Sequence, residues 1–120
     1  MTVKECYEKI NGDYEGVFGR FRGDARIQKF ALKFLKDGSF DSLTKTLEAG
    51  NYEEAFRAAH TLKGVSQNLG FTGLYQISET MTEMLRSNPG DYTPEMLDKV
   101  RAEYEKTYAA IEELQASSEA

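Results

Sequence analysis

The 120-residue chain contains a single histidine, His60, and a single cysteine, Cys6. One cysteine excludes an internal disulfide, and one histidine and one cysteine far apart in sequence do not suffice for a structural zinc site. Histidine ordinarily has a pKa of about 6.5, so a neutral imidazole is available as a nucleophile near pH 7. His60 is therefore the residue whose type points most directly to chemistry.

The sequence around His60 places other functional groups on the same side of a predicted helix. At 100° per residue, Lys63, Gly64 and Gln67 lie within about 60° of His60, and the apolar stripe of the helix is centred about 130° away. The imidazole is thus predicted to point mostly to solvent, with an ammonium group one turn away. A glycine inside a helix costs roughly 1 kcal/mol relative to alanine, which favours close approach of another protein surface at Gly64.

Spacing alone also permits a simpler interpretation. An exposed histidine on a helix commonly has no function, and a lysine near it is commonly solvated surface. Gly64 shifts this balance only modestly toward a functional site.

The elements that would position His60 are all predicted to be helices. Apolar residues recur at three- and four-residue spacing through almost the whole chain, and strand-like alternation is scarce. Short amphipathic helices are predicted over Val3–Ile10 and Asp13–Arg20. Longer helices are predicted to follow N-caps at Asp24, at Ser39 or Asp41, at Asn51 and at Thr72, and a last one to follow Thr93 with Pro94 in its first turn.

The long helix after Asn51 carries His60. Its predicted inward stripe consists of Tyr52, Ala55, Phe56, Ala59, Leu62, Val65 and Leu69. Because short loops favour antiparallel neighbours, the predicted fold is all-α, an antiparallel up-and-down four-helix bundle with additional short N-terminal helices. We expect one domain over residues 1–120, comprising N-terminal helices at 1–23, the bundle at 24–115 and a frayed tail at 116–120.

Composition limits the classes of partner. The formal net charge is −5 and the sequence pI is about 4.9, so the basic field typical of nucleic-acid binding is absent. No segment approaches the roughly 20 apolar residues that span a bilayer, and no apolar run of signal-peptide length is seen. We therefore expect a cytoplasmic protein that binds neither nucleic acid nor membrane.

Two further groups of residues each leave two interpretations open. Three arginines cluster near a predicted turn and are either loop surface or a contact for phosphate or an acidic partner: Arg20, Arg22 and Arg26. Three aromatic residues are either core or an apolar docking rim near His60: Phe18, Phe21 and Phe40.

The string His60-Thr61-Leu62-Lys63-Gly64, which continues to Gly70-Phe71, resembles the H-x-x-K-G signature of histidine phosphotransfer (HPt) domains. The segment Gly50–Ala59 is similar to that family's entry into its active helix. With the predicted helix boundaries and the chain length, the resemblance extends from about Asp24 to Leu114.

The resemblance implies that His60 is phosphorylated, that Lys63 screens the phosphoryl oxygens and that Gly64 admits the partner. It also implies a receiver domain and a hybrid sensor kinase as partners, with Mg²⁺ held by the receiver and no cofactor in this chain. Gln67 stands where the family often has a small residue, and it either hydrogen-bonds the imidazole or phosphoryl group or crowds the docking site. Many members have a glutamine on the following helix that reaches the histidine, but Thr82 occupies that spacing here.

No glycine-rich nucleotide-binding loop is present, so no kinase activity of the chain's own is expected. The bundle is expected to be a monomer. The main alternative function is a non-catalytic helical adaptor, and a weaker one is a phosphatase acting on a receiver. Replacement of His60 separates these, because only a carrier holds the phosphoryl group on this residue.

Overall fold

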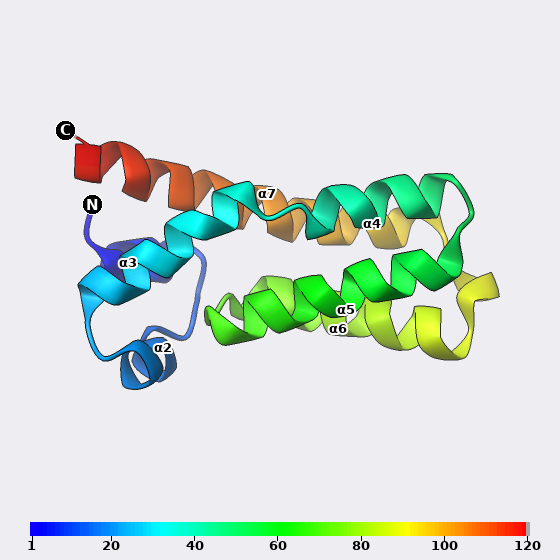
Figure 1. Ribbon diagram of the computed structural model, residues 1–120, viewed down its shortest axis with the longest axis horizontal. Coiled ribbons are helices and arrows are strands. Elements are labelled where there is room, and N and C mark those ends of the chain that lie inside the picture. Colours follow the sequence, from blue (N-terminus) through cyan, green and yellow to red (C-terminus); the bar gives the residue numbers. More distant parts are fainter. Residues whose placement is uncertain (120) are drawn as a thin grey trace.

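The computed structural model describes residues 1–119, and within them the chain folds into an all-α bundle (Figure 1). In chain order the helices are α1 (Val3–Lys9), α2 (Tyr14–Phe21), α3 (Asp24–Lys33), the 3-10 turn η1 (Phe34–Lys36), α4 (Ser39–Glu48), α5 (Tyr52–Asn68), α6 (Thr72–Ser87), the 3-10 turn η2 (Pro89–Asp91) and α7 (Pro94–Glu119). The predicted all-α helical bundle is confirmed.

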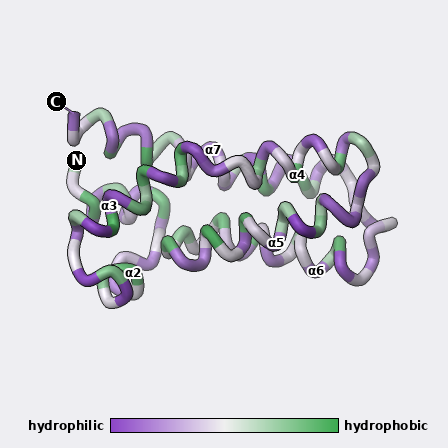
Figure 2. The backbone as a smooth tube through the Cα atoms, viewed as in Figure 1, coloured by the Kyte–Doolittle hydropathy of each residue, from purple (hydrophilic) through white to green (hydrophobic). Residues whose placement is uncertain are grey.

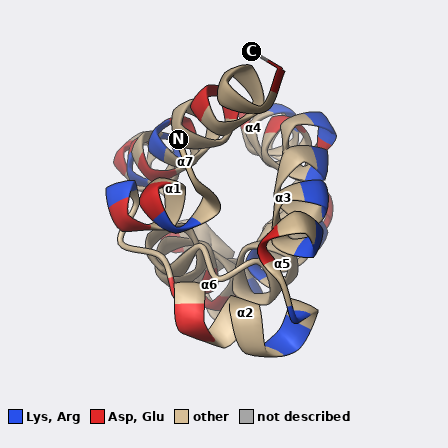
Figure 3. Cartoon of the chain, turned by 90° about the vertical axis from the view of Figure 1, so that its left-hand side faces the viewer, with Lys and Arg blue, Asp and Glu red and all other residues tan. Residues whose placement is uncertain are grey.

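The bundle consists of four long helical segments, and the short helices α1 and α2 lie at one end (Figure 1). The first long segment consists of α3, η1 and α4 in succession. Helices α5, α6 and α7 are the other three, and each successive segment runs antiparallel to the one before it. Figure 3, an end view, shows the helices arranged in a ring. Figure 2 shows apolar residues recurring along each helix, as expected for helices that bury one face in the core and expose the other.

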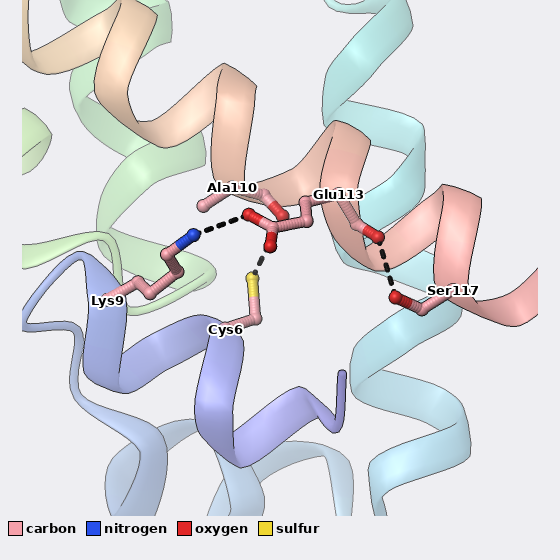
Figure 4. Close-up of polar contacts among 5 residues, drawn as sticks. All are labelled: Cys6, Lys9, Ala110, Glu113 and Ser117. Carbon is pink, nitrogen blue, oxygen red and sulfur yellow. Dashed lines mark hydrogen bonds and ion pairs between the residues drawn. The ribbon is translucent and has the colours of Figure 1, made fainter.

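The first helix closes the bundle against the C-terminal half of α7 (Figure 4). The buried Cys6 thiol donates a hydrogen bond to the Ala110 carbonyl at 3.5 Å, and Lys9 forms an ion pair with Glu113 at the surface. Burial raises the pKa of Cys6 to about 11. The thiol is thus a protonated packing group, which leaves His60 as the reactive candidate.

Helices α5 and α6 form the most extensive helix pair of the bundle. Their buried faces include small side chains, which allow close packing of a helix backbone: Ala55, Ala59 and Ser66 of α5 and Ser78 of α6 are fully buried. Ser66 Oγ donates to the Leu62 carbonyl at 2.7 Å, so its hydroxyl is satisfied within α5. This tight pairing fixes the rotation of α5 and hence the direction of its outer face.

The C-terminal end of α5 is held by the N-terminal segment of the chain. Arg20 donates to the carbonyls of Gln67 and Asn68 at 3.2 and 2.9 Å, and Tyr7 Oη donates to the Leu69 carbonyl at 2.7 Å. The Asp13 N–H donates to the Gly70 carbonyl at 2.9 Å. The carbonyls of four consecutive residues at and just beyond the end of α5 therefore accept hydrogen bonds from α1, α2 and their connection.

Gly70 makes this junction possible. Its φ is +69°, and a Cβ there would lie 2.2 Å from Val17 Cγ2 and 3.0 Å from the Asp13 carbonyl. The Phe71 N–H donates to the Ser66 carbonyl at 2.8 Å, which is the hydrogen bond of a Schellman C-cap. Helix α5 consequently ends at a fixed residue, and α2 packs directly against its end.

Several predicted caps differ from the structure. Asn51 caps α5 as expected, and its side chain accepts from the Glu54 N–H at 3.3 Å. Asp24, however, is the first residue of α3, and its carboxylate accepts a hydrogen bond from Tyr14 Oη instead of capping. At α4 the Asp37 carboxylate accepts from the Ser39 N–H at 2.9 Å, so neither Ser39 nor Asp41 is the cap. Thr72 is likewise the first residue of α6, which follows Phe71.

The last helix is longer than expected. A frayed tail was predicted from residue 116, whereas α7 continues to Glu119. Residue 120 lies outside the described residues. Pro94 is the first residue of α7, in agreement with the sequence pattern.

Candidate functional site

The buried face of α5 is rotated relative to the predicted stripe. The residues of α5 that are buried are Ala55, Ala58, Ala59, Leu62 and Ser66. In contrast, Tyr52 is 37% exposed, and Phe56 and Val65 are half-buried. The prediction of Tyr52 as an inward residue is therefore wrong. The rotation brings aromatic side chains of α5 onto the outer face that also carries the histidine.

His60 is exposed on this face, eight residues before the end of α5. The ring of Phe56, one turn earlier, stacks on the imidazole with a centroid separation of 6.1 Å and an interplanar angle of 16°. Within residues 1–119 no hydrogen bond to the imidazole is found, so no group of this part of the chain competes with a reactant for either ring nitrogen. The ring that stacks on His60 is thus that of Phe56. Phe21 and Phe40 stack on Phe30 and Tyr104, and the Phe18 ring lies tilted against Tyr14.

Lys63 is half-buried on α5. Its charge acts on Glu83 of α6: the hydrogen bond from Arg86, together with the charges of Arg86 and Lys63, lowers the pKa of that carboxyl. The Lys63 ammonium is therefore near the outer face of the α5–α6 pair, within the electrostatic field of a carboxylate.

Gly64 leaves the backbone of α5 uncovered beside His60. A Cβ built at this position would have no heavy atom within 4 Å outside the helix's own backbone. No internal packing therefore requires glycine here, and its helix-propensity cost of about 1 kcal/mol is not offset inside the molecule.

Gln67 is exposed and lies seven residues beyond His60, a rise of about 10 Å along the helix. Its backbone carbonyl accepts from Arg20, and no hydrogen bond joins its side chain to the imidazole. On α6, Thr82 is buried and donates to the Ser78 carbonyl at 2.7 Å, so this side chain does not reach the histidine.

The remaining charges near the site are paired along α5. Arg57 lies 3.5 Å from Glu53 and 3.4 Å from Glu54, consistent with a solvated helix surface for these two acidic residues. Among residues 1–119 no group of three or more His, Cys, Asp or Glu side chains is arranged to hold a metal ion. In the same part of the chain, no helix has both the length and the apolar character to cross a membrane.

The geometry is that of an exposed histidine on the middle of a rigid helix, with a lysine and an uncovered glycine in the next turn. Comparison with protein families gives one match on this region: the family model of the Hpt domain matches residues 35–116. The chain belongs to the Hpt domain family. The match includes all of α4, α5 and α6 and most of α7.

Searches of curated proteins and of solved structures gave no match to this Hpt domain. Helices α1, α2 and α3 precede the matched region. Hydrogen bonds from α1, α2 and their connection to the end of α5 nevertheless make these segments part of the same packed unit, and α3 packs against α1 and α2. The role of Arg20 in this contact could not be predicted from the sequence, because a side-chain hydrogen bond to carbonyls 47 and 48 residues away leaves no local pattern.

Proposed function

We propose that this Hpt domain carries a phosphoryl group on His60 and exchanges it with an aspartate of a receiver domain in a two-component phosphorelay. Family membership supports histidine phosphotransfer in general. The observation that carries the assignment to His60 is that the chain's single histidine is exposed within the matched region. A phosphoryl carrier needs such access, since the aspartate and its phosphoryl group arrive on another protein.

In the proposed reaction an unprotonated imidazole nitrogen of His60 attacks the phosphorus of the receiver's aspartyl phosphate. The bond between phosphorus and the aspartyl oxygen breaks, the carboxylate leaves, and a phosphorus–nitrogen bond forms. The imidazole then loses the proton of its other nitrogen to solvent. Phosphoryl transfer of this kind has a loose transition state with charge on the equatorial oxygens, so catalysis depends on positioning and on nearby positive charge.

We assign the positive charge in this chain to Lys63. Its ammonium is a compact point charge that suits phosphoryl oxygens, and it lies one turn from His60 on the same side of α5. Gly64 admits the partner because nothing projects from the backbone there. The Mg²⁺ that this reaction uses would be held by the receiver, where it neutralises phosphoryl charge.

We assign Gln67 to the edge of the docking surface, because its side chain is exposed about 10 Å from His60 along the helix. Residues 1–120 are proposed to act as a single Hpt domain, in which residues 1–23 brace the bundle formed by 24–115. The working form is proposed to be a cytoplasmic monomer supplied with phosphoryl groups by a hybrid sensor kinase.

The direct test mixes the purified chain with a receiver domain that carries a labelled aspartyl phosphate in the presence of Mg²⁺. Label is expected on the wild-type chain as an acid-labile, base-stable phosphohistidine, and none on His60→Gln. Circular dichroism of both proteins checks that the fold is retained. If label never transfers from any of several receivers to a folded wild-type chain, the carrier proposal is wrong and a binding-only adaptor replaces it. Faster loss of receiver phosphate without label on the chain indicates a phosphatase.

A further inference from the structure

A groove lies beside the proposed phosphorylation site, where α5 begins and α6 ends (Figure 1, right-hand end). Its volume is about 330 Å³. The lining comes from the first turns of α5, the last turn of α6 and the turn η2: Tyr52, Glu53, Phe56, Leu85, Arg86 and Pro89.

The groove is continuous with the His60 site through Phe56. One side of this residue lines the groove, and its ring stacks on the imidazole at 6.1 Å. At 1.5 Å per residue, Phe56 and Tyr52 lie about 6 and 12 Å from His60 along the helix axis. A standard protein interface covers about 800 Å² per partner, which as a disc has a radius of roughly 16 Å. A partner centred on His60 therefore covers the groove.

The groove offers apolar surface, because its charged residues are already engaged. Glu53 pairs with Arg57 at 3.5 Å, and Arg86 forms an ion pair with Glu83 of its own helix. What remains facing the groove is the Phe56 ring, the buried Leu85 side chain and the Pro89 ring. Glu53 and Arg86 carry opposite charges, so they give the groove no net charge that would select a charged side chain, and the apolar groups that line it favour an apolar one.

Tyr52 forms the exposed rim of this groove. It and Phe18 are the large hydrophobic residues that are exposed in the part of the chain the structure describes, at 37% and 44%. The Tyr52 ring packs against the ring of Tyr92, with a centroid separation of 6.2 Å. A tyrosine fixed in this way loses little side-chain entropy when it is covered, which is why tyrosines often dominate binding energy at interfaces.

We infer that this groove receives an apolar side chain of the receiver domain, and that Tyr52 is a determinant of receiver affinity separate from the phosphoryl chemistry. The inference rests on the proposed function, since the receiver is the partner that must cover His60. The occupant belongs to a surface element that lies about 6–12 Å from the receiver's phosphorylated aspartate when the two proteins are docked.

The test compares Tyr52→Ala, Tyr52→Phe and Phe18→Ala in two reactions of the full chain. The first is transfer from a phosphorylated receiver, and the second is phosphorylation of His60 by phosphoramidate, a small donor that needs no docking surface. Tyr52→Ala is expected to lower kcat/KM for the receiver at least 10-fold, mainly by raising KM, and to leave the phosphoramidate rate within 2-fold of wild type. Tyr52→Phe and Phe18→Ala are expected to match wild type in both reactions.

Each other outcome is informative. A receiver reaction of Tyr52→Ala at the wild-type rate overturns the groove inference and leaves the phosphoryl-carrier proposal intact. An equal loss in both reactions, or a loss in Phe18→Ala as large as in Tyr52→Ala, overturns it as well, because the effect then arises from His60 geometry or from general apolar area. If wild type accepts no phosphoryl group from any receiver but is phosphorylated by phosphoramidate, the proposed function itself has failed.

Discussion

The ring of Phe56 stacks on the imidazole of His60 with the two planes only 16° apart. One turn of helix separates the two residues, and Phe56 itself is half-buried against α6. The histidine is therefore exposed but not free to rotate on every side. A partner that approaches over Gly64 meets an imidazole already supported on the opposite, N-terminal side.

Replacement of Phe56 by leucine tests this support. Leucine keeps apolar volume in the groove but removes the ring–ring contact, and aromatic pairs are worth about 0.5–1.5 kcal/mol. The rate of His60 phosphorylation by phosphoramidate is expected to fall about 2- to 10-fold. The measurement is the amount of phosphohistidine formed as a function of time. An unchanged rate in Phe56→Leu with an unchanged melting curve would show that the stacking does not orient the nucleophile.

Lys63 is expected to contribute charge and not docking area. Hydrogen bonds to charged groups are worth about 1.5–3 kcal/mol, so Lys63→Ala should slow single-turnover transfer from the receiver about 10- to 100-fold. The dissociation constant of the unphosphorylated complex should change much less. Lys63→Arg, which keeps the charge, serves as the control and should recover part of the rate. Equal losses in the two variants would argue against a role for the charge itself.

The bundle could be predicted from the sequence because helical periodicity is a local signal that persists over whole segments. Cap positions were harder, since several residues of the right type stand near each helix start. Asp24 has the right type and place for an N-cap, yet its carboxylate bonds to Tyr14 of a neighbouring helix. Gly38 is the N-cap residue of α4, and the Asp37 carboxylate accepts from the Ser39 N–H, an arrangement that no periodic pattern distinguishes from a cap at Asp41.

Only the part of the candidate site that lies within one local motif could be predicted from the sequence. His60, Lys63 and Gly64 belong to one short motif on one helix, so their shared face follows from the helical repeat. The position of Tyr52 depends on the rotation of α5, which is set by the extensive packing of α5 against α6. Apolar character alone suggested that Tyr52 points inward, and only tertiary packing shows it at the rim of the groove.

Arg20 should matter for stability although it lies outside the family-matched region. Arg20→Ala removes two hydrogen bonds to the last carbonyls of α5, for an expected loss of about 1 kcal/mol and a fall in Tm of about 4 °C. Hydrogen exchange should quicken at amides near residues 66–71, at the end of α5. Arg22→Ala, a neighbouring exposed arginine on the same turn, is the matched control. Equal effects of the two variants would mean that charge near the turn matters and not the hydrogen bonds.

Alkaline pH is expected to weaken the fold through Cys6. A free thiol titrates near 9.0, whereas burial raises the pKa of Cys6 to about 11. The folded chain thus holds this proton more tightly than the unfolded chain, so the stability contribution is complete below pH 9 and is lost as pH rises toward 11. Urea unfolding at several pH values should show a decline in this window, smaller in Cys6→Ala. Burial also raises the pKa of Tyr7 above its usual range, so part of the decline above pH 10 should persist in that variant.

Larger side chains at position 64 are expected to stabilise the fold and to weaken docking of the receiver. Alanine at this position meets no neighbouring atom and removes the helix-propensity cost of glycine, so Gly64→Ala is expected to be more stable by about 1 kcal/mol, with Tm higher by about 4 °C. Gly64→Leu should retain most of that gain, because the side chain extends into open space.

The same substitutions should slow transfer from the receiver in order of size, mildly for alanine and at least about 10-fold for leucine, since each added atom holds the partner away from the backbone beside His60. Phosphorylation by phosphoramidate should stay near the wild-type rate in both variants. Thr61→Leu, on an exposed part of α5 outside the strip that His60 shares with Gly64, provides the size-matched control. A Gly64→Leu protein that is more stable and still accepts phosphoryl groups from the receiver at full rate would show that the glycine is not there to admit a partner.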